Sequence, residues 1–346
     1  MTLPPEPQRW DIDEVTVARA QAVAAYGFTE RQARFLVTVM LHSGVFVERQ
    51  YCAFAGIVHG QKTHDFLARL VERKIATPIT AGTLHRGRLF HVQYKPLYAA
   101  IGETDNRHRK PMTTGRMIER LMILDAVLDD RTHSWLGTEA DKRMYFMRRL
   151  RPAVPLEQFP RLTFGQTPRR TVRYFPDKLP IGVQADEHDE HVFLYLVTRP
   201  DPMDFRVFLV RHSELLRSLF RWTVRVLFPE PFARGIPRFG HAAREQLAMP
   251  INPAARPDLE WYFRERQQPS RQRVPADDLH FRRVMSWARA PHVRALYQVW
   301  LQQGDWVISG APSGILRDKI ERREGRFEFV SLSRQYLHLS SLVGIA

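Results

Sequence analysis

The sequence has a single cysteine, Cys52, among 346 residues. One cysteine excludes an intrachain disulfide, a cysteine-rich zinc site and a CxxC redox motif. The apolar runs are short, the longest lying in HVFLYLV from His191, and none could span a membrane as a helix. The N-terminal segment MTLPPEPQRWDIDE lacks the basic and apolar regions of a signal peptide. These absences predict a soluble, cytoplasmic protein without membrane contact.

Lysine and negative charge are also scarce. Only seven of the 52 Lys+Arg residues are lysine, against 37 Asp+Glu, which gives a net charge of +15 and a pI of about 10.4. A GC-rich genome explains the preference for arginine equally well, but it does not explain the net charge. That excess predicts a polyanionic partner, with nucleic acid first and a membrane surface second.

Motifs for nucleotide cofactors and metals are missing. The chain contains neither GxxxxGK[ST] nor GxGxxG, so no nucleotide cofactor is indicated. The run DEHDEH from Asp186 to His191 holds potential metal ligands, but alternate residues of a hairpin point to opposite faces. We therefore interpret it as a solvated acidic turn and predict neither a metal site nor a cofactor.

Two proline-rich stretches divide the chain and predict an α+β fold in several parts. Proline ends helices and is excluded from central strands, so both stretches are expected to be irregular. The predicted parts are a winged-helix domain over 1–110, a helical connector over 111–150, a strand-rich α+β domain over 151–228, a proline-rich linker over 229–275 and a helical or winged domain over 276–346.

The N-terminal part has the clearest pattern. A cap at Thr29 precedes apolar residues at helical spacing up to Gly44, and a short extended piece, VFV, follows. Two further helices are predicted over 48–54 and 61–74, then a turn with basic residues over 81–88 and an alternating strand over 89–94. This order of helix, strand, helix, helix and hairpin resembles the winged helix-turn-helix superfamily.

The resemblance implies which side chains would contact DNA. The recognition helix would bring Gln61, Lys62, Thr63, His64 and Arg69 to the major groove. Arg86 and Arg88 would lie at the tip of the wing, near phosphate or the minor groove. A winged helix that contacts only proteins remains an alternative.

The central part predicts strands over 172–175, 181–183, 191–198 and 205–210, followed by a helix over 213–228. Pro176-Asp177 before an apolar strand resembles the start of a PD-(D/E)xK nuclease core. That chemistry needs a second carboxylate and a lysine on the next strand, and Val192–Val197 has neither. The sequence therefore predicts no catalytic residues in this α+β domain and leaves a degenerate nuclease-like core as one alternative for its fold.

The C-terminal part predicts helices and a second basic surface at Arg317, Lys319, Arg322 and Arg323. His280 and Arg283 fit the HxxR pair of tyrosine recombinases, and Tyr336 lies downstream. A four-residue match is common by chance in a chain so rich in arginine, so we assign these residues no catalytic role.

The whole order is similar to that of bacterial mobile-element proteins of the replication-relaxation type. The resemblance implies a protein that binds double-stranded DNA sequence-specifically. It would act as a regulator or an accessory factor of a mobile element in replication, transfer, recombination or defence. A homodimer and protein partners in a nucleoprotein complex fit that role. The alternatives are a nuclease or recombinase, and a protein-binding scaffold.

Overall fold

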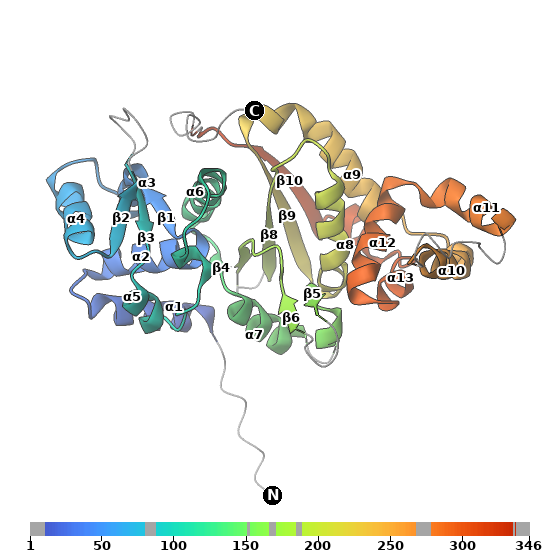
Figure 1. Cartoon of the computed structure of the whole chain (residues 1–346), viewed down its shortest axis with the longest axis horizontal. Coiled ribbons are helices and arrows are strands. Elements are labelled where there is room, and N and C mark those ends of the chain that lie inside the picture. Colours follow the sequence, from blue (N-terminus) through green and yellow to red (C-terminus); the bar gives the residue numbers. More distant parts are fainter. Residues whose placement is uncertain are drawn as a thin grey trace, which may run out of the picture. The chain divides into compact units, whose positions relative to one another are not determined.

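The structure, a computed structural model, describes residues 11–79, 88–150, 153–165, 171–184, 189–267, 278–334 and 336 (Figure 1). The chain divides into two compact units. The first comprises residues 1–145, 179–184 and 332–346, and the second comprises residues 146–178 and 185–331. Helices and strands occur in both, so the fold is α+β, as predicted.

The first unit is mainly helical with short strands. Its elements are α1 (Ile12–Ala24), α2 (Glu30–His42), β1 (Val45–Val47), α3 (Glu48–Ala55), α4 (Gln61–Glu72), β2 (Ala76–Ile79), β3 (Leu89–Val92), α5 (Lys95–Ala100), the 3-10 helix η1 (Arg107–Arg109), α6 (Thr114–Asp129), β4 (Ser134–Leu136), the first part of α7 (Glu139–Leu150) and β7 (Ile181–Val183). Strand β4 pairs antiparallel with β7.

Local sequence signals set the ends of these helices. The Thr29 hydroxyl accepts from the backbone N–H of Gln32, whose side chain accepts from the N–H of Thr29, forming a capping box. Gly56 ends α3 in the left-handed conformation, at φ 63°. The predicted helices and the predicted strand at Val45–Val47 are confirmed.

Strands β1, β3 and β2 form an antiparallel sheet in that order. Phe90 of β3 lies opposite Phe46 on one side and Pro78 on the other. The core of the unit is aromatic: the ring of Phe35 lies 5.1 Å from the rings of both Phe46 and Tyr51. Tyr51 in turn lies 4.3 Å from Phe66 of α4, so α4 is fixed to the core by aromatic contacts.

The second unit contains longer strands. Its elements are the 3-10 helices η2 (Leu156–Gln158), η3 (Glu230–Gly235) and η4 (Pro253–Ala255), the strands β5 (Arg161–Phe164), β6 (Thr171–Tyr174), β8 (Glu190–Leu196), β9 (Arg221–Phe228) and β10 (Gly325–Ser331), and the helices α8 (Met203–Ser218), α9 (Ile236–Ala248), α10 (Arg256–Gln267), α11 (Asp278–Ala288), α12 (Pro291–Gln303), α13 (Trp306–Gly310) and α14 (Ile315–Glu321). Strands β5 and β6 form an antiparallel pair.

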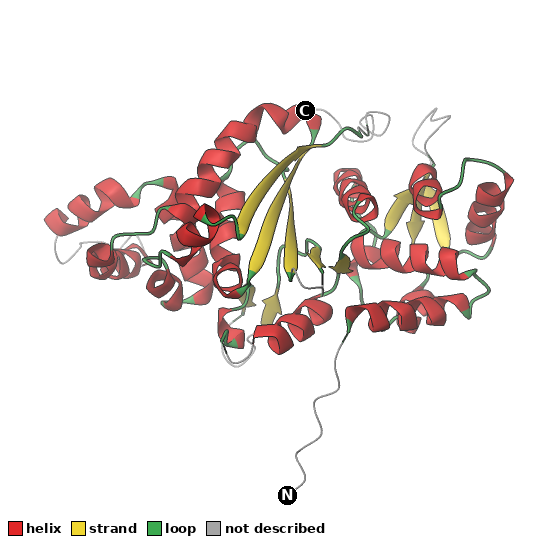
Figure 2. Ribbon diagram, turned by 180° about the vertical axis from the view of Figure 1, so that it is seen from behind, coloured by secondary structure: helices red, strands yellow, loops and turns green. Residues whose placement is uncertain are grey.

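Strands β8, β9 and β10 run parallel, side by side (Figure 2). On one face, aromatic side chains pack against helices, and Phe239 of α9 lies 5.2 Å from Phe228 and 5.5 Å from Phe205 of α8. The other face carries ion pairs such as Arg225–Glu328 at 2.7 Å. Parallel neighbours need crossover connections, which α8 provides between β8 and β9.

Two predictions for the central part were wrong. Residues 205–210, predicted as a strand, lie within α8, and residues 221–228, predicted as helix, form β9. All six residues from Phe205 to Val210 are buried in α8, so their burial shows no helical period. The run at 205–210 is apolar except for Arg206, and it is compatible with either structure, because a buried helix and a buried strand look alike over six residues.

The stretch 229–275, predicted as an irregular linker, is largely helical over its described residues 229–267. Several of its prolines occupy the beginnings of helices, such as Pro237, the second residue of α9, and Pro253, the first of η4. Proline is favoured there because the first N–H groups of a helix have no intrahelical partner. The segment after it does not end in a separate wing either, since β10 joins the sheet beside β9.

Candidate nucleic-acid interface

Helix α4 presents a polar face to solvent. Phe66, Leu67 and Leu70 are buried against the core, while Gln61, Lys62, His64 and Asp65 are exposed. The amide of Gln61 donates to Asp65 at 2.6 Å, so these two side chains partly satisfy each other. Lys62 and His64 are thereby the most available polar groups at the beginning of this helix.

Thr63 was wrongly predicted as a DNA contact. Its side chain is fully buried, and its hydroxyl lies 3.5 Å from the sulfur of Cys52. The sequence contained a signal for this, because Thr63 precedes Phe66 and Leu67 by three and four residues and therefore shares their face. Thr63 fixes α4 to α3 and cannot reach a nucleic acid without unfolding the helix.

Arg69 is also engaged within the protein. It donates to the backbone carbonyl of Gly27 at 3.1 Å, and its guanidinium lies 5.8 Å from the ring centre of Phe28. Arg73, which the sequence prediction omitted, makes a similar pair of contacts, donating to the carbonyl of Tyr26 at 2.6 Å. Both arginines join α4 to the segment before α2, so the role of Arg69 is at least partly structural.

The predicted wing is described only at its base. Ile79 and Leu89 are the last paired residues of β2 and β3. Residues 80–87, with Arg86, lie outside the described residues. Arg88 is exposed immediately before β3, which places a positive charge beside this end of the sheet.

The predicted second basic surface, in the second unit, is largely neutralised. Arg317 pairs with Asp318 at 3.2 Å. Lys319 is wrongly predicted as a surface contact, because its side chain is 14% exposed and its ammonium donates to the carbonyl of Leu219 at 2.8 Å. Arg322 and Arg323 are exposed. Two cations therefore remain of the four predicted.

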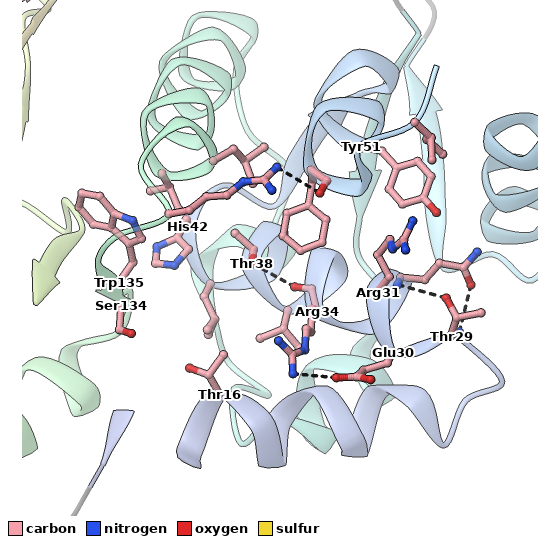
Figure 3. A pocket seen from close by; sticks show the side chains of 18 of the residues that line it. Thr16, Thr29, Glu30, Arg31, Arg34, Thr38, His42, Tyr51, Ser134 and Trp135 are labelled. Carbon is pink, nitrogen blue, oxygen red and sulfur yellow. Dashed lines mark hydrogen bonds and ion pairs between the residues drawn. The ribbon is translucent and has the colours of Figure 1, made fainter. Parts of the chain in front are cut away.

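A groove of about 1030 Å³ runs along α2 in the first unit (Figure 3). Thr16, Ser134, Trp135 and His42 lie toward one end, and Tyr51, Arg31 and Thr29 toward the other. Charges of both signs line it: Arg31, Arg34, Lys62, Arg69 and Arg131, with Asp13, Glu30, Asp65 and Asp130.

These charges are mostly satisfied inside the protein. Arg34 pairs with Glu30 at 2.7 Å, Arg31 donates to the carbonyl of Ala55 at 3.0 Å, and Arg131 donates to the carbonyl of Ala53 at 2.8 Å. The walls of the groove are thus partly polar and partly apolar, and they do not carry a net charge of one sign. It shares Lys62 with the exposed face of α4.

His42 lines this groove. Its lowered pKa predicts that the stability of the folded protein depends on pH. Burial, followed by the charge of Lys142, lowers the pKa of His42 from 6.5 to about 3. Below pH 6.5, His42 binds a proton in the unfolded chain but stays neutral in the folded protein. The free energy of unfolding therefore falls as the pH falls. From pH 8 to pH 5 this loss should reach about 2 kcal/mol.

The measurement is urea unfolding of the wild type and of His42→Gln at both pH values. Other groups titrate equally in the two proteins, so the wild type should lose about 2 kcal/mol more than the variant. An equal loss in both would show that His42 does not stay neutral in the folded state.

The residues weighed for catalysis have structural partners. Asp177 accepts from Arg211 at 2.7 Å, so an arginine already neutralises the carboxylate that a nuclease would need for its cation. Burial, followed by the charge of Asp125, raises the pKa of Tyr336 far above its usual range. That environment disfavours the phenolate of a recombinase nucleophile. Within the described ranges, no three His, Cys, Asp or Glu side chains converge as metal ligands.

Comparisons with models of protein families, with curated proteins and with solved structures found no match to this chain. None of the described helices has the length and apolar character that crossing a membrane requires.

Proposed function

We propose that the first unit binds double-stranded DNA, with α4 in the major groove and the β2–β3 hairpin beside it. The observation that carries this proposal is the exposed polar beginning of α4, held on an aromatic core next to a sheet whose open end carries Arg88. The net charge of +15 supports a polyanionic partner. The proposed role is that of a sequence-specific regulator or accessory factor of a bacterial mobile element.

The proposal predicts a specific loss in Lys62→Ala. Lys62 is exposed and carries no packing role, so its removal should leave the fold intact and weaken binding to a 30-base-pair duplex by about three- to fivefold at 0.1 M salt. The slope of log affinity against log salt should fall by about one. Fluorescence anisotropy over a salt series measures both quantities on the full chain.

Lys95→Ala is the matched control, because Lys95 is an exposed lysine at the beginning of α5. It changes the net charge equally but lies outside α4 and the hairpin. If Lys62→Ala and Lys95→Ala bind the duplex with the same affinity and the same salt dependence, α4 does not contact the DNA. Selection from a random duplex library then tests sequence preference in the wild type.

A second candidate is a protein-binding unit, and the groove along α2 favours it. Apolar rings of Tyr51, Phe54 and Trp135 line the groove beside charged side chains, a combination typical of protein interfaces. Duplex binding that is weak and independent of Lys62, together with a partner that protects the groove, would favour this function over the first.

A further inference from the structure

One end of the groove along α2 contains two buried histidines. His42 is the last residue of α2 and is 4% exposed, and His133 directly precedes β4 with a side chain that is 7% exposed. Both rings line the groove, and Figure 3 shows His42 at the same end as Ser134 and Trp135 of β4. We call this end of the groove, bounded by His42, His133 and Trp135, the histidine pocket.

Direct contacts bring the two rings to the same short strand. A β-carbon at Gly137, which directly follows β4, would lie 2.9 Å from Cε1 of His42, so the end of α2 touches the end of β4. At the beginning of the strand, the ring of His133 lies 6.1 Å from the ring of Trp135. Because β4 is only three residues long, both histidines border the same small part of the groove.

Close packing holds β4 in place. Gly182 of β7 lies opposite Trp135, and a β-carbon at Gly182 would lie 3.0 Å from Cβ of His133 and 3.1 Å from the ring of Trp135. The indole N–H of Trp135 donates to the backbone carbonyl of Asp130 at 3.1 Å. The protein itself therefore fixes the rings of the histidine pocket, as a binding site requires.

The hydrogen bonds of His133 determine which of its ring nitrogens carries the proton. Nδ1 lies 3.0 Å from Oδ1 of Asp130 and 2.9 Å from the hydroxyl of Thr132. That hydroxyl donates its own proton to Asp130 at 2.7 Å, and a carboxylate can only accept. Nδ1 is therefore the donor, and Nε2 of the neutral ring is a hydrogen-bond acceptor.

Each of the two histidines has a ring nitrogen without a partner. Nδ1 of His42 and Nε2 of His133 are both buried, and neither has a hydrogen-bond partner among the described residues. A buried polar atom without a partner costs stability, so each one requires an explanation. Because both rings line the groove, a molecule bound in the groove can supply the partners.

The charges around the histidine pocket disfavour a charged ligand. Burial lowers the pKa of His42, and the charge of Lys142, only partly opposed by Asp141, lowers it further. A cation beside His42 would meet the same repulsion. An anion beside His133 would approach the carboxylate of Asp130 and find an acceptor instead of a donor at Nε2. A neutral ligand avoids both costs.

Apolar side chains complete the walls. Trp135, Leu41 and Leu128 line the groove beside the two histidines. A carboxamide or a lactam is neutral and planar, and it presents an N–H donor next to a carbonyl acceptor. The N–H matches Nε2 of His133, while neutral His42 has both a donor and an acceptor nitrogen. A flat ring attached to the amide would pack beside the apolar side chains.

We propose that the histidine pocket binds a small neutral molecule through a planar carboxamide or lactam group, whose N–H donates to Nε2 of His133. The groove of about 1030 Å³ continues to Lys62 of α4 and leaves room for further parts of the molecule. The site does not depend on the proposed DNA binding, because its residues lie outside α4 and the β2–β3 hairpin.

Probes of nearly the same shape test the proposal on the full chain. Benzamide is neutral and has the amide N–H, whereas benzoate is an anion and benzamidinium is a cation. Titration followed by ligand-observed NMR should give a Kd of about 1 mM for benzamide and about tenfold weaker binding for each charged probe. Benzamide that binds no better than benzoate and benzamidinium would overturn the proposal.

His133→Asn separates the ligand contact from the structural one. The asparagine amide can still donate to Asp130 from near the position of Nδ1, but it places no acceptor at the position of Nε2. The Tm should therefore change by no more than about 2 °C, while the affinity for benzamide should fall about tenfold. Affinity for the charged probes should not change.

His42→Leu provides a second variant, because Nδ1 of His42 has no partner to lose among the described residues. Its Tm should equal or exceed that of the wild type, and benzamide should bind about tenfold more weakly. Lys62→Ala is the control, since Lys62 lines the same groove from α4. It should keep the affinity of the wild type for benzamide.

The outcomes separate this site from the proposed DNA binding. Loss of benzamide binding in His133→Asn with unchanged duplex binding would support the histidine pocket, whether or not Lys62→Ala affects the duplex. Unchanged benzamide binding in both His133→Asn and His42→Leu would overturn the proposal. The groove would then be left to the protein partner of the second candidate function.

Discussion

Gly44→Ala is expected to lower the free energy of unfolding of the first unit by about 3 kcal/mol. Gly44 has φ 79°, a conformation that costs alanine about 1 kcal/mol. A β-carbon there would also lie 2.3 Å from the carbonyl oxygen of His108. Because that oxygen belongs to backbone fixed by Asn106 and His91, relief requires η1 to move away from α2, at a further cost of about 2 kcal/mol.

Gly56→Ala is the matched control for this effect. Gly56 has φ 63°, but a β-carbon at Gly56 would have no atom within 4 Å. It should therefore cost only about 1 kcal/mol. Calorimetry of the full chain measures both variants, and equal destabilisation would contradict the steric role of His108.

Asp125→Ala should be destabilising by a similar amount, about 3 kcal/mol. The carboxylate of Asp125 is 8% exposed and accepts from three side chains: Arg49 at 2.7 and 2.8 Å, Gln50 at 2.8 Å and Tyr336 at 2.5 Å. Its removal takes one acceptor from the hydroxyl of Tyr336 and one from the buried amide of Gln50, which still donates to the carbonyl of Leu121 at 3.0 Å. Arg49 is half-exposed and regains water, which keeps the cost at the lower end of the range for a broken buried pair.

Asp129→Ala, one turn further along α6, is the corresponding control. Asp129 also pairs with an arginine, Arg334, at 2.7 Å, but its side chain is 56% exposed. The loss of that pair should cost about 0.5 kcal/mol or less. Denaturant unfolding separates the two variants. Similar values for both would mean that burial of Asp125 contributes nothing, contrary to the interpretation of this network.

The network also shows what α6 holds together. Arg49 and Gln50 belong to α3, Asp125 to α6 and Tyr336 to the C-terminal segment. Tyr336 packs with Val45, Val47, Leu89 and Leu121. Nothing in the pattern around Tyr336 indicated this contact, because its partners lie more than 200 residues away in the sequence.

Much of the first unit followed from local pattern. The cap at Thr29, the glycine after α3 and the apolar spacing in α4 each act within a few residues, so their effects can be predicted without a tertiary structure. The same spacing places Thr63 on the buried face of α4, and the sequence prediction overlooked that signal. The wrong strand at 205–210 has another cause, since this run is apolar except for Arg206 and is too short to show a period.

The sequence by itself determined the net charge, the limits set by a single cysteine, and the predicted helices and strands between Thr29 and Tyr94, because composition and short-range spacing are properties of the chain. Only the tertiary structure decided which cations are available. Lys319 and Arg69 are bound to the carbonyls of Leu219 and Gly27, whereas Lys62 and Arg88 stay exposed. Whether a charged side chain has a partner depends on which groups the fold places beside it. These groups can be distant in the sequence, so the sequence pattern does not reveal them.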